Sequence, residues 1–174
     1  MTSTETVLDP VDHITADAIG KPGERVFYLQ AKKGDTAITF FIEKVQLQSL
    51  AIGARQFLEE IAKNDAELEP IQGDYDEDEM HIQLPVEPAF RIGDLGLAYD
   101  KERDMVCLIL KEITLEKKDE DLQLARLWCT RQQLLALAHW SETVASRGRP
   151  ICPQCLQPME PEGHFCPKKN GRKH

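Results

Sequence analysis

The sequence predicts an α+β fold: a pseudo-symmetric duplication of a βββα unit, with an antiparallel sheet packed against two helices and a small C-terminal metal-binding tail. Three observations lead to this prediction. Two amphipathic helical segments are each preceded by three strand-like segments within the 174 residues. The two helical segments match in register. Residues 150–174 then change in composition and carry a cysteine motif.

The first half, about residues 9–65, contains three predicted strands and a helix. Residues 11–19 can extend, and a Lys-Pro-Gly turn separates them from the aromatic and β-branched run at 25–31. A Gly-Asp turn precedes a third strand at 36–42. The apolar period then becomes helical, which predicts a helix over 45–63.

Two segments outside these elements are expected to lack regular structure. Residues 1–8 are polar and should fray. Residues 74–79 hold five acids in six positions, which repel one another and predict a solvated loop. This loop lacks the spacing and central glycine of a calcium site. The proline-rich residues 84–88 lead into the second half.

The second half, about residues 88–147, repeats the order of the first. Its three predicted strands are 90–99, 105–110 and 122–129. The middle strand is continuously apolar, which indicates burial on both faces. A second helix begins at about Arg131, where Thr130 and Gln133 form a capping-box pattern, and it ends before Gly148.

The two halves match at an offset of 87 positions. Gln46-Leu47 corresponds to Gln133-Leu134 in the helices, and Phe41 corresponds to Trp128 in the preceding strands. We therefore expect a duplication of one ancestral unit, giving a domain over residues 1–149. The alternative is that two amphipathic helices resemble each other by chance.

Charge is unevenly distributed along the chain. The net charge is −9, but residues from 147 onward carry six basic and two acidic side chains, so this end is +4 and residues 1–146 are −13. An acidic body argues against coating nucleic acid by bulk charge. There is no apolar run of membrane-spanning length and no signal-peptide pattern, so we expect a cytoplasmic protein that does not enter a membrane.

The tail at residues 150–174 carries a candidate zinc site. Cys152 and Cys155 form a C-x2-C pair, and His164 and Cys166 follow. Three thiolates and one imidazole would close a tetrahedral Zn²⁺ site with no open position, so we expect a structural metal. His174 is an alternative fourth ligand. A redox C-x-x-C motif and a disordered tail are the alternatives.

Three stretches together resemble a known family. They are Gly20 to Ala31, Pro85 to Gly93, and the ending from Gly148 through Cys152-Pro153-Gln154-Cys155 and Pro161-Glu162-Gly163-His164-Phe165-Cys166-Pro167 to Gly171. This pattern resembles an uncharacterised bacterial family catalogued as domain of unknown function 3090, sometimes labelled a repeat protein. The resemblance implies no established activity, and its label agrees with a duplication.

Other combinations of reactive residues give no catalytic signature. Asp12-His13, with Asp17 nearby, is more typical of a strand edge than of an acid–base pair. His139 and Ser141 lie two residues apart on a helix, so they point in different directions and cannot form a nucleophile–base pair.

The remaining cysteines and aromatic residues are expected to have packing roles. Cys107 lies in an apolar strand and Cys129 lies beside Trp128, so all three are predicted to be core residues. Tyr28 with nearby Arg25 would stack bases if exposed, but a core position is the expectation.

The sequence therefore favours a non-catalytic interaction or regulatory protein that binds another protein. One alternative is an enzyme whose site lies between the two halves. The other is single-stranded nucleic-acid binding through the repeated sheets or the basic tail.

Overall fold

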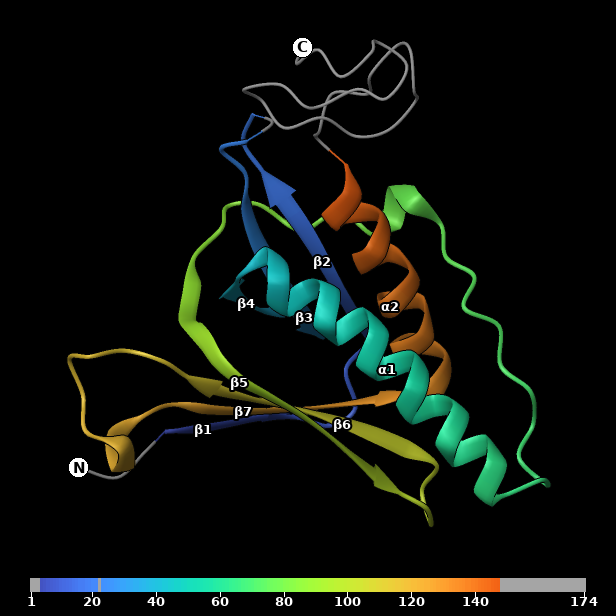
Figure 1. Ribbon diagram of the computed structural model, residues 1–174. Coiled ribbons are helices and arrows are strands. Elements are labelled where there is room, and N and C mark those ends of the chain that lie inside the picture. The colour runs from blue at the N-terminus through green and yellow to red at the C-terminus, as the bar shows by residue number, and fades with distance from the viewer. Residues whose placement is uncertain (1–3, 22, 148–174) are drawn as a thin grey trace, which may run out of the picture.

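The computed structural model describes residues 4–21 and 23–147 and has an α+β architecture (Figure 1). Its strands are β1 (Glu5–Leu8), β2 (His13–Ile19), β3 (Val26–Lys33), β4 (Thr36–Ile42), β5 (Pro88–Asp100), β6 (Met105–Glu112) and β7 (Leu124–Thr130). The helices are α1 (Lys44–Asn64) and α2 (Arg131–Ser146), with short 3-10 helices η1 (Glu77–Glu79) and η2 (Asp119–Asp121). All the predicted strands and both predicted helices form close to their expected bounds.

The strands form one seven-stranded sheet in the order β1-β7-β6-β5-β4-β3-β2. The expectation of an antiparallel sheet is wrong for two pairings in this part of the chain, because β1 pairs with β7 and β4 pairs with β5 in parallel. Each parallel pair joins strands far apart in sequence. Local hairpin signals therefore gave no sign of either pair.

Strand β1 also corrects the prediction that residues 1–8 lack regular structure. Glu5–Leu8 is a strand because its backbone pairs with Leu124–Leu127 of β7. Thr6 and Val7 favour a strand, but four residues are too few to form one alone, so the partner strand determines the conformation.

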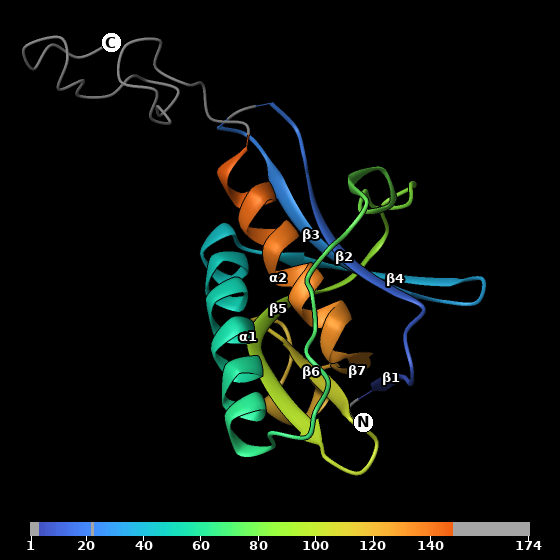
Figure 2. The same ribbon diagram turned by 90° about the vertical axis from the view of Figure 1, so that its right-hand side faces the viewer.

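The two end strands of the sheet, β1 and β2, follow each other directly in the chain, so the sheet is strongly bent. Residues 9–12 connect them and are hydrogen-bonded to the strand next to each end, β7 and β3. The amide of Val11 donates to the carbonyl of Trp128 in β7 (2.8 Å), and that of Asp12 donates to the carbonyl of Lys32 in β3 (2.7 Å). Helices α1 and α2 lie side by side against one face of this bent sheet (Figures 1 and 2).

Both helices begin with a reciprocal cap. At α2, Thr130 Oγ1 accepts from the Gln133 amide (3.0 Å) and Gln133 Oε1 accepts from the Thr130 amide (2.9 Å), as the sequence predicts. At α1, Gln46 Oε1 accepts from the Glu43 amide (2.8 Å). These bonds satisfy amides that have no partner within their helix.

The core lies between the helices and the inner face of the sheet. Side chains at helical spacing on α1 are buried there: Leu47, Leu50, Ala51, Ala54, Leu58 and Ile61. The α2 residues expected to face the core are also buried: Leu134, Leu137, Ala138, Ser141, Val144 and Ala145. Trp140, which the pattern did not place in the core, is fully buried.

The opposite face of β5, β6 and β7 has no helix over it in the described residues. Trp128 lies on this outer face, so the prediction that it belongs to the core is wrong. It is half-buried beneath the guanidinium of Arg103, which lies 5.0 Å from the ring centroid. None of the described helices is both long and apolar enough to span a membrane.

Candidate functional site

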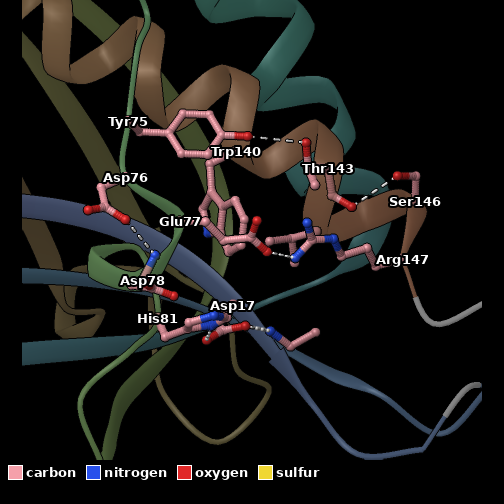
Figure 3. Close-up of polar contacts among 12 residues, drawn as sticks. Asp17, Tyr75, Asp76, Glu77, Asp78, His81, Trp140, Thr143, Ser146 and Arg147 are labelled. Carbon is pink, nitrogen blue, oxygen red and sulfur yellow. Dashed lines mark hydrogen bonds and ion pairs between the residues drawn. The ribbon is translucent and has the colours of Figure 1, made fainter.

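A polar cluster forms where β2, the connection from α1 to β5, and the end of α2 meet (Figure 3). The connection leaves α1, runs along α2 and reaches β2, as Figure 2 shows. Its contact with α2 is close: a Cβ atom at Gly73 would lie 2.5 Å from His139 Nδ1. Only glycine therefore fits at this position without a shift of the connection.

Asp17 and His81 form an acid–imidazole pair at the centre of this cluster. Asp17 Oδ2 lies 3.1 Å from His81 Nδ1 and also accepts from the Ile82 amide (3.1 Å), while Oδ1 accepts from the Ala18 amide (2.9 Å). A carboxylate only accepts, so the hydrogen bond requires a proton on His81 Nδ1, and Nε2 is the acceptor in the neutral form of the ring. The Asp17 side chain is 16% exposed and that of His81 is 54% exposed.

Trp140 of α2 packs against the Asp17–His81 pair. Its indole N–H donates to the Ala16 carbonyl (2.6 Å), and its ring centroid lies 5.6 Å from that of His81 and 5.5 Å from that of Tyr75. The guanidinium of Arg147 covers the ring at 5.1 Å. The indole is therefore completely enclosed by strand, connection and helix end.

Two arginines complete the cluster at the C-terminal end of α2. Arg147 pairs with Glu77, and its guanidinium holds the pKa of that carboxyl below its ordinary value. Arg25 donates to the carbonyl of Val144 (3.2 Å) and to that of Arg147. Burial lowers the pKa of Arg25, and nearby Arg147 lowers it further. Cations at this end complement the helix dipole, which accounts for both residues structurally.

The cluster contains a proton acceptor but no paired nucleophile. Tyr75 Oη lies 3.5 Å from Thr143 Oγ1, and the Thr15 hydroxyl donates to the Met80 carbonyl, so none of these hydroxyls is hydrogen-bonded to His81. The described residues also contain no group of three His, Cys, Asp or Glu side chains able to hold a metal ion. The predicted zinc ligands, Cys152, Cys155, His164, Cys166 and the alternative His174, lie outside the described residues.

The other histidines and acids singled out in the sequence do not form a site. Asp12 accepts from the Gly34 amide (2.7 Å), and the Nε2 atom of neighbouring His13 is buried without a partner. Burial lowers the pKa of His13. His139 Nδ1 faces the Gly73 carbonyl (3.2 Å), while Ser141 Oγ is buried and unpartnered, so these two do not pair, as predicted.

Cys107 and Cys129 are packing residues, as predicted. Both thiols are free and buried. Burial raises the pKa of Cys107 and raises that of Cys129 to about 12. Neither thiol ionises near neutral pH, so neither is a reactive nucleophile.

A second candidate surface is an apolar groove between α1 and β5. It contains two successive hollows, of about 300 and 230 Å³. The first is lined by Phe57, Glu60, Ile61, Asn64, Asp65, Tyr99 and Lys101, and the second by Ser49, Leu50, Gly53, Leu95, Gly96, Leu97 and Leu108. We call this surface the α1–β5 groove.

The groove exists because little side-chain volume fills the space between helix and strand. A Cβ atom at Gly53 would meet nothing within 4 Å. Leu95, Leu97 and Tyr99 project from one face of β5 and remain half-buried. Tyr99 Oη donates to Asp104 (2.7 Å). Burial, and to a smaller extent this hydrogen bond, raise the pKa of Tyr99 to about 12.

Sequence reasoning missed both surfaces for the same reason. Asp17 and His81 are 64 residues apart, and Gly53 meets Leu97 only in the folded chain. The usable signals were a single glycine inside an amphipathic helix and a histidine two residues after an acidic run.

The described residues form an α+β fold with a bent mixed sheet, an open apolar groove and an acid–imidazole pair. The chain belongs to the family described as Protein of unknown function (DUF3090), whose model matches residues 6–166. No curated protein and no solved structure matches the chain.

Proposed function

We propose that this is a non-catalytic, cytoplasmic interaction protein that binds a partner protein through the α1–β5 groove. The observation that carries the proposal is the open apolar groove itself, bordered by Glu60, Asp65 and Lys101. Apolar hollows with a few polar groups at the rim are typical of sites that bind side chains of a partner.

We further propose that the scaffold arose by duplication, as the sequence predicts. The supporting observations are contacts that occur twice with the halves exchanged. Gln46 Nε2 donates to the Gly93 carbonyl (3.0 Å), and Gln133 Nε2 donates to the Asp12 carbonyl (3.3 Å). The glutamines are 87 positions apart, and the two acceptors occupy matching places just before the β6-paired part of β5 and before β2.

Helix-to-helix contacts support the same exchange. Arg55 and Glu142, also 87 positions apart, form a bidentate ion pair at 2.7 and 3.1 Å. A two-fold axis between two copies brings such equivalent positions together. The two parallel strand pairs show the same exchange of halves. Thr39 of β4 lies beside Pro88 of β5, and its counterpart Arg126 of β7 lies beside Val7 of β1.

Structural Zn²⁺ in the tail remains part of the proposal. It rests on the spacing of Cys152, Cys155, His164 and Cys166, with His174 as the alternative ligand. Elemental analysis of the purified full chain should find about one zinc per chain, and Cys152→Ser should remove it. A metal-free wild-type chain would contradict the site.

A peptide selection tests the interaction proposal without a known partner. Displayed peptide libraries are selected on the full chain, and the recovered binders are then tested for binding to Gly53→Trp, which fills the groove from open space. Gly53→Ala is the matched control, because it changes helix propensity but adds only a methyl group. Binders lost on Gly53→Trp and kept on Gly53→Ala are expected; binders indifferent to both changes would refute a role for the groove.

An enzyme with a site between the halves is the second candidate, favoured by the Asp17–His81 pair. A histidine oriented by a carboxylate suits general-base catalysis. Purified wild type and His81→Gln should be compared on panels of esters and phosphoesters. Turnover that falls about 100-fold in His81→Gln would favour this candidate. Equal rates for the two proteins would exclude His81 as the base.

Nucleic-acid binding receives less support. Arginines on the sheet are engaged by acids: Arg103 pairs with Asp9, and Arg126 pairs with Glu5 at 2.6 Å. Their charge is largely neutralised before any phosphate arrives. Binding of single-stranded RNA or DNA that weakens steeply with salt would revive this alternative.

A further inference from the structure

The two helices differ most in side-chain size at one pair of equivalent positions. Residue 53 of α1 corresponds to residue 140 of α2, and these are glycine and tryptophan. Trp140 fills the space between α2 and β2 and donates to the Ala16 carbonyl. At Gly53 the corresponding space between α1 and β5 is the hollow lined by Leu95 and Leu97. The groove is therefore the unfilled counterpart of the Trp140 site.

The Trp140 site is covered by the chain segment that follows the other helix. After α1, residues 65–81 run along α2, with Gly73 against His139, Tyr75 against Trp140, and Glu77 against Arg147. By the same exchange of halves, the segment that follows α2 corresponds to the segment that would cover α1. That segment is residues 148–174, which lie outside the described part of the chain.

The surface of α1 has the apolar character that such a cover requires. Val45 is 69% exposed and Ile52 is 52% exposed, seven residues apart and hence on one face. Ile52 is the counterpart of His139, which Gly73 covers in the other half. These two large exposed apolar side chains on α1, of which Ile52 lines a further hollow facing the end of α2, favour an additional occupant along the helix.

The charges of the two segments and their helices are also complementary. Between Lys63 and Arg91 the sequence has nine acids and no lysine or arginine, and this acidic connection meets Arg147 on α2. The counterpart of Arg147 on α1 is Glu60, at the rim of the groove. Residues 148–174 are basic, with five lysines and arginines against two glutamates. An acidic segment thus meets an arginine at the end of α2, and a basic segment would meet a glutamate on α1.

We propose that residues 148–174 bind in cis along α1 and over the α1–β5 groove, as residues 65–81 cover α2. This inference rests on the proposed function. The bound segment regulates access to the same groove. A partner protein then reaches the groove only by displacing the basic segment. Because the attraction is partly between exposed charges, it weakens at high salt, and displacement becomes easier.

Site-specific photo-crosslinking in the full-length chain tests this proposal. The probe is p-benzoylphenylalanine at Ser49, an exposed position that lines the groove, with the same residue at exposed Ala37 of β4 as the control. The expected result is an intrachain crosslink from position 49 to a peptide within 148–174, mapped by mass spectrometry, and none from position 37. Interchain crosslinks, crosslinks elsewhere, or no crosslink at position 49 would overturn the proposal.

Two further measurements keep the result interpretable. Exchanging Lys168, Lys169, Arg172 and Lys173 for glutamate should reduce the crosslink severalfold, and an unchanged yield would overturn the electrostatic part. Exposed Gln56, one helical turn from Ile52, provides a second probe position if the variant at Ser49 does not fold.

The outcomes separate the two proposals. Peptide binders that depend on Gly53, combined with no crosslink to the tail, would leave the interaction function standing and refute the cis contact. A tail crosslink in the wild type, with no peptide binder even on the chain in which Lys168, Lys169, Arg172 and Lys173 are exchanged for glutamate, would support the cis contact and refute the interaction function.

Discussion

Replacing Trp140 with phenylalanine tests the most heavily enclosed contact between the two halves. The indole N–H donates to the Ala16 carbonyl (2.6 Å), and the side chain is completely buried. Phenylalanine keeps an aromatic ring beside Tyr75 but removes the donor. The carbonyl of Ala16 then keeps only the longer contact with the Thr15 hydroxyl (3.3 Å), because the closed site admits no water as a replacement.

The expected cost follows from two effects. Losing the shorter of two hydrogen bonds to a buried acceptor costs about 1–3 kcal/mol, and the small void left by the missing part of the indole adds about 1 kcal/mol. The free energy of unfolding should therefore fall by about 2–4 kcal/mol. For a chain of this size that corresponds to a lower Tm by about 5–15 °C.

Urea denaturation followed by circular dichroism measures this change. Trp128→Phe is the matched control, because Trp128 is half-buried on the outer face and its indole N–H makes no hydrogen bond within the described residues. The control should lose less than about 1 kcal/mol. Equal losses in the two variants would refute the reasoning, because the enclosed hydrogen bond would then contribute nothing.

Three further predictions follow from individual contacts. The buried guanidinium of Arg131 holds the pKa of Asp104 below its ordinary value, so this pair stabilises the fold above that value and loses its effect as pH falls through it. In urea titrations, Asp104→Asn should cost about 1 kcal/mol at neutral pH, because the Asp104 side chain is 42% exposed and solvent screens the pair, with the gap to wild type closing below about pH 4; a constant gap would contradict the linkage. Alkylation mapped by mass spectrometry should spare Cys129 in the native protein and modify it in urea, and native modification would contradict its burial. Arg55→Glu and Glu142→Arg should each cost up to about 1 kcal/mol, and the double variant should recover much of the loss, which a double-mutant cycle measures.

The local elements could be predicted because their signals are local. The helix at α1 follows from an apolar face at helical spacing, and the start of α2 follows from Thr130 and Gln133, whose reciprocal bonds form as expected. Strand β1 could not be predicted, because a segment of only four residues becomes a strand through its parallel partner β7, which is distant in the sequence.

The burial of individual aromatic residues was less accessible to sequence reasoning. Trp128 was expected in the core because it aligns with Phe41, but both are half-buried on the outer face of the sheet. Alternation along a strand indicates two faces without saying which face the helices cover. Trp140 was missed because its counterpart, Gly53, carries no side chain to suggest a buried position.

The candidate surfaces depend on contacts between distant residues, which periodicity does not encode. Asp17 and His81 meet only because the connection after α1 crosses α2 and returns to β2 (Figure 3). The groove depends on the absence of side-chain volume at Gly53 opposite Leu97. A glycine in a helix signals lower propensity, and only the packed structure turns that signal into a groove.

The most direct test of the account is to locate a bound peptide by nuclear magnetic resonance. A peptide from the selection is titrated into the isotope-labelled full chain, and backbone amide shifts are followed to saturation. If the α1–β5 groove binds the peptide, saturable shifts are concentrated at Gly53, Gly96 and Leu97 and are lost in Gly53→Trp. Shifts concentrated instead around Trp128 on the outer face of the sheet would contradict it.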